Sequence, residues 1–389
     1  MEHLPEEISR FLRTGKGDFE ELALALFQYQ FEKNSPYQAF CQAQGKTPEQ
    51  ISRWEEIPAV PIHAFKSKEL VTFPVAQAAA VFHSSATTSG TPSRHFIRDL
   101  RYYEASIKTG FEGNIIDRAH TAYDCGASAL LRDCGSAGSG APLQITFLIL
   151  IPSPAEAPHS SLSWMMEVLR GRWGTPCSEY MVRKGRLDEP RLAQVLAKSQ
   201  SSKEKVMVLG TTLAFLAFFD YCAKTGQRFQ LPESSRLMDT GGMKTSRLEI
   251  TRPTFVDDVR TYLGIPEMDC INEYGMCELS SQFYGQGRTS FLQGPPWVRS
   301  RILDPVTGES AVPGQPGLLC HYDLANMDSV MAIQTEDIGL SGKGSDTLEQ
   351  YVAPKCQTPH NALAGFVLLG RAPEAELKGC SLNAEAFLR

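Results

Sequence analysis

The sequence predicts an α/β fold in which strands alternate with helices, followed by a part built mainly of strands. Between residues 144 and 273, short apolar runs of strand length alternate with helical apolar patterns, as in folds with largely parallel sheets. After residue 285 the pattern changes to strand-like runs joined by turns. The 389 residues exceed what one domain core usually holds, so two or more subdomains are expected.

The N-terminal part of the chain is predicted to be mainly helical. Apolar side chains recur at roughly helical spacing over residues 19–31, and Asp18 directly before them is a suitable N-cap. Residues 57–62 are rich in proline and are predicted to be extended. A further helix is expected over residues 100–112.

The central part of the chain carries the alternation that defines the fold class. We predict strands over residues 144–151, 205–209, 236–239 and 268–273, and helices over residues 161–169, 191–199, 213–222 and 254–263. The first of these strands is a continuous apolar run bounded by prolines, which is typical of a strand buried on both faces.

The C-terminal part is predicted to be β-rich, as a barrel or a small sheet. Strands are expected over residues 298–303, 317–322 and 331–336, with a turn at 304–309. The expected division is therefore an α/β core over residues 1–285, a β-rich subdomain over 286–370, and a short tail over 371–389.

Composition excludes several classes of protein. The net charge of −6 argues against a nucleic-acid-binding surface. The acidic N-terminus lacks the apolar stretch of a signal peptide, and no run of eighteen apolar residues predicts a membrane span. The ten cysteines show no zinc-binding spacing. We therefore expect a cytoplasmic protein with reduced thiols.

The first segment that could carry chemistry is a run of small hydroxylated residues between 84 and 94. It contains Thr88, Ser89, Gly90 and Thr91, and it ends at Arg94. Small side chains let backbone N–H groups approach phosphate oxygens, and the hydroxyl groups and the guanidinium add donors. The Gly-Lys-Ser/Thr of a Walker A loop is absent. A surface turn rich in Ser and Thr is the alternative interpretation.

The second segment follows the predicted strand over residues 268–273. Tyr274 and Gly275 form a turn there, and Glu278 comes three residues later. Ligands of open α/β sheets bind beyond the carboxyl ends of strands. A carboxylate in that position can hold Mg²⁺ against the phosphates of ATP. The alternative is an ordinary turn glycine with a solvated Glu278.

Three weaker segments complete the candidate site. Gly241, Gly242 and Met243 follow a short strand and could let a flat base lie on the backbone, although a plain strand-to-helix turn shows the same pattern. Asp337 can accept hydrogen bonds from ribose hydroxyls, and Arg371 can reach sugar or phosphate oxygens. A capping aspartate and a surface arginine are the alternatives.

A cysteine near the end of the chain is the candidate nucleophile. Cys380 follows a glycine and lies two residues from Lys378, a setting that can lower the pKa of an exposed thiol. Such a thiol could accept an acyl group as a thioester. An inert buried cysteine is the alternative.

Taken in order, these segments resemble the acyl-adenylate-forming superfamily of acyl-CoA synthetases, adenylation domains and luciferases. The five matching segments are 88–91, 239–243, 274–278, 335–337 and 370–371. The resemblance implies the large N-terminal domain of these enzymes, with two α/β subdomains and a β-rich subdomain. It also implies that their C-terminal domain is largely absent here.

Within the superfamily, the chain resembles the long-chain acyl-protein synthetase family of bacterial bioluminescence operons. The likeness rests on residues 150–153, 160–165 and 370–382 and on the length of the chain. It implies that ATP and Mg²⁺ activate a fatty or other carboxylic acid as acyl-AMP. It further implies transfer of the acyl group to Cys380 and an acyl reductase as the partner protein.

The chain departs from the superfamily pattern at several positions. Pro92-Ser93-Arg94 shortens the usual phosphate loop, and Cys277 stands where a threonine is usual. Two other functions therefore stay open. One is an AMP-forming acyl- or aryl-CoA ligase, and the other is a degenerate nucleotide-binding subunit of a reductase complex.

Overall fold

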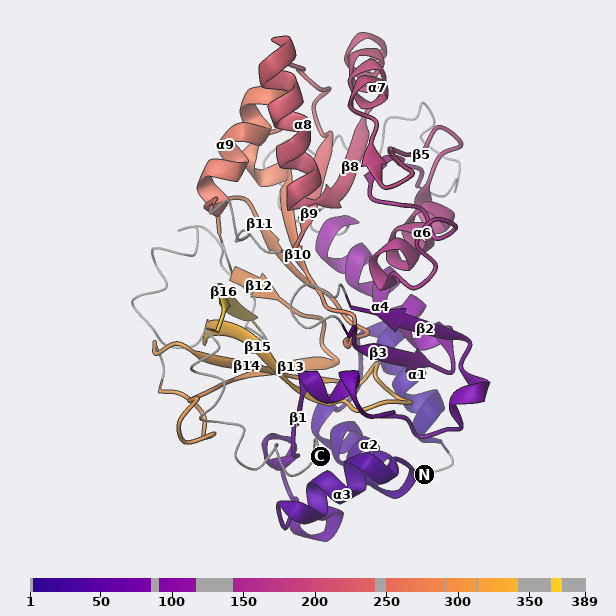
Figure 1. Ribbon diagram of the computed structural model, residues 1–389, viewed down its shortest axis with the longest axis vertical. Helices are drawn as coiled ribbons and strands as arrows, with labels where there is room; N and C mark the ends of the chain where they lie inside the picture. Colours follow the sequence, from indigo (N-terminus) through magenta and orange to yellow (C-terminus); the bar gives the residue numbers. More distant parts are fainter. Residues whose placement is uncertain are drawn as a thin grey trace.

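A mixed sheet of twelve strands runs through the described part of the chain (Figure 1). The computed structural model describes residues 3–84, 91–116, 143–241, 250–289, 291–312, 314–341 and 365–372. The strands of the sheet are β1 (Val60–Pro61), β4 (Thr146–Leu150), β5 (Glu179–Tyr180), β8 (Val206–Thr211), β9 (Arg236–Thr240), β10 (Cys270–Tyr274), β11 (Phe283–Gln286), β12 (Phe291–Gln293), β13 (Val298–Leu303), β14 (Gly317–Asp323), β15 (Ala332–Ser341) and β16 (Gly365–Arg371).

The sheet changes from parallel to antiparallel at β10. Its order is β13-β14-β15-β16-β12-β11-β10-β9-β8-β4-β5, with β1 beside β15. The strands from β5 to β10 pair in parallel, and those from β10 to β13 pair antiparallel. The β-rich part is found as predicted, and it continues the same sheet and is not closed into a barrel, because β12 pairs with both β11 and β16 and joins the two parts.

Helices cover both faces of the parallel part. The helices α7 (Glu189–Ser202), α8 (Thr212–Thr225) and α9 (Arg252–Leu263) pack on one face, and α4 (Leu100–Phe111) and α6 (Ser161–Trp173) on the other. Side-chain caps fix where these helices begin. For example, the Thr211 hydroxyl accepts a hydrogen bond from the Ala214 N–H, and Ser160 caps Ser163 in the same way.

The N-terminal helices pack against the antiparallel part of the sheet. They are α1 (Leu4–Thr14), α2 (Phe19–Lys33) and α3 (Ser35–Ala43), drawn in indigo in Figure 1, and they share one apolar core with β13, β14 and β15. Asp18 caps α2 through the Glu21 N–H, as predicted. Among the described ranges, none of the helices has the length and hydropathy needed to cross a bilayer.

Two short hairpins and several single turns complete the described elements. The hairpins are β2 (Ala80–His83) with β3 (Arg94–Ile97), and β6 (Val182–Arg183) with β7 (Arg186–Leu187). The turns are η1 (Pro48–Gln50), η2 (Trp54–Glu56), η3 (Ile62–Lys66), η4 (Val75–Gln77), η5 (Glu112–Ile116) and η6 (Glu267–Asp269). The β2–β3 hairpin matters for the site, because the predicted phosphate segment connects its strands.

Candidate functional site

The candidate site lies where the sheet changes direction. Tyr274 is the last residue of β10, the central strand at which parallel pairing ends. Thr240 pairs with Glu273 in register, so Gly241 lies beside the end of β10. Two of the predicted segments therefore meet at the carboxyl ends of neighbouring parallel strands, which is where open α/β sheets bind ligands.

Tyr274 connects the end of β10 to β15. Its ring is buried, and it packs edge-on against Phe283 and Phe366. Packing on several sides fixes the ring, so its hydroxyl is directed to Asp337 and donates to Oδ2 at 2.9 Å. Burial raises the pKa of Tyr274, and the nearby Asp337 raises it further. The hydroxyl therefore remains a neutral hydrogen-bond donor.

Asp337 and Arg371 face each other across β15 and β16. They are register partners, and Arg371 Nε lies 3.8 Å from Asp337 Oδ1. The Arg371 side chain is 65% exposed and the Asp337 side chain 17%. Burial raises the pKa of Asp337, against the lowering effects of the Tyr274 hydroxyl and Arg371. This long, open pair leaves donors on Arg371 accessible to a ligand.

Glu278 lies close to the same arginine. Its carboxyl is buried, and burial raises its pKa, against the hydrogen bond from Ser93 and the charge of Arg371, which lower it. The charge of Arg371 also acts on Tyr274 and Asp337. Tyr274, Glu278 and Asp337 therefore all feel the charge of one exposed guanidinium, and Ser93 joins them through Glu278. With Arg371 itself, these residues come from four separate segments of the chain.

Ser93, directly before β3, and His95 within β3 both contact the Glu278 turn. Ser93 bonds to Glu278, and the His95 ring bonds to the Cys277 carbonyl oxygen at 2.9 Å. Arg94 lies between them, so its side chain points to the other face of the strand. There it pairs with His83 and lies over the Phe96 ring, 5.4 Å from its centroid. The structure thus brings Ser93, and not Arg94, to Glu278.

Several predicted site residues stay predictions. Thr91 is exposed at the start of the described segment, and Gly241 is exposed with φ +100°, a backbone conformation that favours glycine. The others lie outside the described residues: Thr88, Ser89, Gly90, Gly242, Met243 and Cys380.

The described residues do not form a complete Mg²⁺ site by themselves. Within the described ranges, no group of three or more His, Cys, Asp or Glu residues is placed to hold a metal ion. Mg²⁺ is often bound by one or two carboxylates together with substrate phosphates. Glu278 fits that arrangement as a single carboxylate ligand.

Three further residues of the site were not singled out from the sequence, although Thr335 lies in the matching segment 335–337. Thr335 accepts a hydrogen bond from the Asp337 N–H at 3.0 Å and donates to the Leu319 carbonyl at 2.8 Å, which fixes the backbone of β15 just before Asp337. His321 lies 3.4 Å from the Tyr274 hydroxyl. Ser93 belongs to the hydroxyl-rich run, which was the one available signal for it.

Comparison with known proteins places the chain in a family. The family model of LuxE, the acyl-protein synthetase, matches residues 164–388, more than half of the chain. The chain belongs to the LuxE acyl-protein synthetase family. This confirms the family that the motifs indicated, and with it the assignment as an enzyme of the ligase class.

Two curated relatives match the chain at low identity. The long-chain-fatty-acid–luciferin-component ligase of Aliivibrio fischeri is 21% identical over 326 residues, covering 82% of this chain and 78% of the relative. The protein of the same name from Vibrio harveyi is 23% identical over 323 residues, with the same coverage.

Solved structures of 2-hydroxyisobutyryl-CoA ligase share the fold. An open conformation in complex with 2-HIB-AMP and CoA aligns with a TM-score of 0.54 at 16% identity, and the postadenylation state with R3-HIB-AMP aligns with 0.55 at 16% identity. Each covers 82% of this chain, while the chain spans 65% and 63% of their lengths. The predicted adenylate-forming α/β fold is confirmed.

Proposed function

We propose that this protein uses ATP to activate a carboxylic acid, most suitably a fatty acid, as acyl-AMP and then transfers the acyl group to a protein thiol. The observation that carries the proposal is the convergence of Tyr274, Glu278 and Asp337 near Arg371, with Ser93 bonded to Glu278. The family assignment and the fatty-acid ligase names of its curated relatives support the substrate class.

In the first half-reaction a carboxylate oxygen attacks the α-phosphorus of ATP. The bond from that phosphorus to the bridging oxygen breaks, and pyrophosphate leaves. Asp337 accepts hydrogen bonds from the ribose hydroxyls, and Arg371 donates to sugar or phosphate oxygens. Holding both anionic substrates in a fixed orientation removes much of the entropic barrier to their reaction.

The phosphates of ATP are proposed to bind between the turn after β10 and the hydroxyl-rich segment. Mg²⁺ on Glu278 would supply positive charge next to the phosphates. Donors from Thr88, Ser89, Gly90 and Thr91 stabilise the negative charge that develops on them. Arg94 takes a supporting electrostatic role from the outer face of β3.

The adenine base and the acyl chain are proposed to bind at different places near the carboxyl ends of β9 and β10. Gly241, Gly242 and Met243 are proposed to hold the adenine. For the acyl chain, α6 is a better wall than α8, because Met165 and Met166 of α6 lie in the same apolar cluster that Cys277 packs against. The buried side chains of α8 lie in the cluster on the opposite face.

In the second half-reaction a thiolate attacks the carbonyl carbon of acyl-AMP. A thioester forms and AMP leaves with the electrons of the carbon–oxygen bond. Cys380 is the proposed acceptor, an acyl reductase is the proposed partner that consumes the thioester, and the cytoplasm is the proposed compartment.

Acid-dependent exchange of labelled pyrophosphate into ATP tests the adenylation step. Exchange is expected with Mg²⁺ and a fatty acid, and Glu278→Gln should lower its rate at least a hundredfold, the scale seen when one electrostatic transition-state contact is removed. Glu309→Gln, at an exposed turn residue, is the matched control. Folded protein that gives no exchange with any fatty or aromatic acid would overturn the proposal.

Labelled fatty acid tests the acceptor. Label that is stable to denaturation and released by hydroxylamine is expected on the wild type and absent from Cys380→Ser. Cys177→Ser, which changes an exposed cysteine, is the control and should keep the label. Acyl-CoA in solution with no label on the protein would instead favour the CoA ligase.

A further inference from the structure

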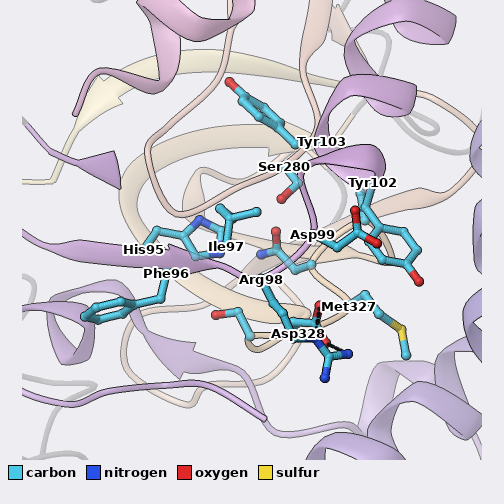
Figure 2. A pocket seen from close by; sticks show the side chains of 13 residues that line it. His95, Phe96, Ile97, Arg98, Asp99, Tyr102, Tyr103, Ser280, Met327 and Asp328 are labelled. Carbon is cyan, nitrogen blue, oxygen red and sulfur yellow. Dashed lines mark hydrogen bonds and ion pairs between the residues drawn. The ribbon is translucent and has the colours of Figure 1, made fainter. Parts of the chain in front are cut away.

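A small cavity lies behind the turn that carries Glu278. Its volume is about 10 Å³, which is room for about one water molecule. His95, Tyr102, Ser280 and Asn326 are among the residues that line it. Figure 2 shows the imidazole of His95 and the side chain of Ser280 turned toward the middle of this space.

Two buried side-chain atoms on the lining have no hydrogen-bond partner among the described residues. They are His95 Nε2 and Asn326 Oδ1, and both side chains are almost fully buried. Leaving such an atom unsatisfied costs about 1–3 kcal/mol. Buried polar atoms beside a cavity of this size are commonly satisfied by an ordered water.

Both atoms are hydrogen-bond acceptors. His95 Nδ1 lies 2.9 Å from the Cys277 carbonyl oxygen, which can only accept, so Nδ1 carries the proton and Nε2 is the acceptor of a neutral ring. Asn326 Nδ2 donates to the carbonyl oxygens of Glu278 at 2.9 Å and Val330 at 3.1 Å, which identifies the other amide atom as the oxygen. Two acceptors cannot bond to each other, but one water can donate to both.

The same two side chains hold consecutive carbonyl groups of the site turn. His95 holds the Cys277 carbonyl and Asn326 holds the Glu278 carbonyl. Two residues after Glu278, the Ser280 N–H donates to Asp323 Oδ2 at 2.9 Å. The backbone on both sides of the Glu278 side chain is therefore fixed from neighbouring elements.

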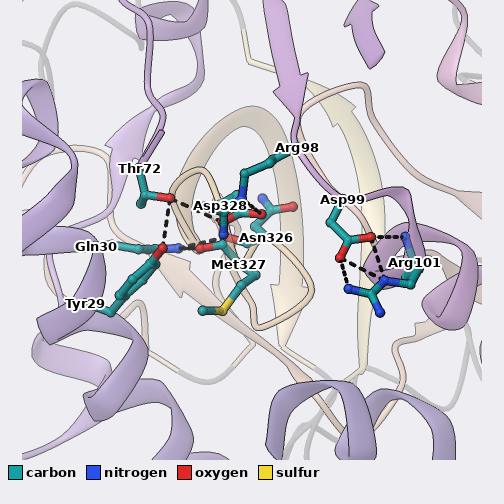
Figure 3. Close-up of polar contacts among 9 residues, drawn as sticks. All are labelled: Tyr29, Gln30, Thr72, Arg98, Asp99, Arg101, Asn326, Met327 and Asp328. Atoms are coloured by element: carbon teal, nitrogen blue, oxygen red, sulfur yellow. Dashed lines mark hydrogen bonds and ion pairs between the residues drawn. The ribbon is translucent and has the colours of Figure 1, made fainter. Parts of the chain in front are cut away.

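The loop that supplies Asn326 is itself anchored. In Figure 3 the Gln30 amide from α2 reaches this loop, donating to the Asn326 carbonyl at 2.7 Å. Gln30 Oε1 also accepts from the Met331 N–H at 3.0 Å. Asn326 is thus a fixed support, and the position of Glu278 depends on it.

We propose that His95 and Asn326 are positioning residues for Glu278, joined by one water bound between His95 Nε2 and Asn326 Oδ1. The inference rests on the proposed function in giving Glu278 its role at the phosphates. It adds a water-binding site and two residues that act through the backbone of the turn. A displacement of about 1 Å at a reacting group can cost about a hundredfold in rate, so this support matters for catalysis.

Two substitutions at one position separate the two bonds of His95. His95→Asn places an amide N–H near the position of Nδ1 and keeps a donor for the Cys277 carbonyl, but it removes the acceptor at Nε2. His95→Gln reaches toward the position of Nε2 and loses the donor at Nδ1. Tyr102→Phe, on the same cavity wall and pointing away from His95 in Figure 2, is the control.

Steady-state pyrophosphate exchange measures the outcome. Each His95 variant should lower kcat by about ten- to a hundredfold and raise the Mg²⁺ concentration needed for half-maximal rate, with the KM for the acid unchanged. Asn326→Ala should act similarly. The double variant His95→Asn, Asn326→Ala should lose much less than the product of the two single losses. Multiplicative losses, or an unchanged kcat in all variants, would overturn the proposal.

A crystal structure of the whole protein tests the water site even if no exchange activity is found. The expected result is an ordered water within hydrogen-bonding distance of both His95 Nε2 and Asn326 Oδ1, and its loss with a shifted Glu278 turn in His95→Asn. A wild-type map with both side chains well ordered and no density between them would overturn the inference. The proposed function fails separately, through the absence of exchange in the wild type.

Discussion

Two aspartate–arginine pairs lie next to predicted nucleotide-binding segments, and they differ in nearly every physical respect. Asp239 pairs with Arg252, and their side chains are 0% and 3% exposed. Asp239 Oδ2 also accepts from Thr212 at 3.1 Å and Asn272 at 3.2 Å. Arg252 Nε donates to the Gly287 carbonyl at 2.9 Å. This closed pair ties β9, β10 and the start of α9 together.

The second pair, Asp337 with Arg371, is open. The distance between the groups is 3.8 Å, and the arginine side chain is 65% exposed. Asp337 shares its carboxylate with the Tyr274 hydroxyl. Water screens an ion pair of this kind, so it adds little stability, but its groups are free to exchange water for a ligand. The same two residue types thus support structure in one place and recognition in the other, and burial decides which.

Breaking the closed pair should have the largest effect on stability. Asp239→Asn leaves the Arg252 guanidinium buried without its counter-charge, so the free energy of unfolding should fall by about 3–5 kcal/mol. Urea unfolding followed by circular dichroism measures this. Asp257→Asn, which breaks the exposed pair with Arg288, should leave the midpoint unchanged. Equal midpoints for both variants would contradict the distinction between closed and open pairs.

Glu273, a buried carboxyl beside the closed pair, should make stability depend on pH. Burial raises its pKa from about 4.5 to about 7, against the hydrogen bond from Thr240. The folded state therefore retains a proton that the unfolded state releases, and stability should fall as pH rises from about 4.5 to 7 and stay level above it. The loss amounts to about 3 kcal/mol at most.

The difference between the wild type and Glu273→Gln isolates this contribution. Unfolding midpoints measured at half-unit steps from pH 4.5 to 8 should show a slope in the wild type that the variant lacks. Asp323, whose pKa burial raises to about 6, contributes equally to both proteins and cancels in the difference. Parallel profiles would show that Glu273 ionises normally in the folded protein.

The sequence predicted the parallel part of the fold well because apolar runs mark its strands. The predicted strand over residues 268–273 is found as Cys270–Tyr274, and that over 236–239 as Arg236–Thr240. The sequence did not predict β11, β12 and β16, which are short or pair with strands far along the chain. The pairings of β12 with β11 and β16 join the β-rich part to the core.

Site residues were harder to predict than strands because contacts depend on register. Ser93 and Arg94 are adjacent, and both have side chains suited to phosphate, but only the alternation of side chains along the extended backbone at the start of β3 decides that Ser93 contacts Glu278. Similarly, Asp239 and Asp337 look equivalent beside their motifs, and only burial distinguishes them. Asp337 meets Arg371 because β15 pairs with β16.

A smaller effect is expected at Tyr274, which links the open pair to the core. Tyr274→Phe removes the donor to Asp337, so stability should fall by about 0.5–1.5 kcal/mol and the KM for ATP should rise severalfold while the KM for the acid stays constant. Tyr284→Phe is the matched control, because the buried Tyr284 hydroxyl has no partner in the described part of the chain. A greater loss of stability at Tyr284 would contradict this assignment.

Substitution of Arg371 should have the smallest effect on stability and a large effect on activity. Its side chain is mostly exposed and its ion pair is long, so Arg371→Gln should change the free energy of unfolding by less than about 0.5 kcal/mol. A lost charged hydrogen bond to ATP is worth about 1.5–3 kcal/mol, so kcat/KM for ATP should fall by about ten- to a hundredfold. Arg371→Lys keeps the charge without the planar fork of donors, and it should recover only part of the loss.

Urea unfolding and pyrophosphate exchange on the same preparations make the comparison direct. If Arg371→Gln destabilised the protein as much as Asp239→Asn does, the open pair would be structural after all.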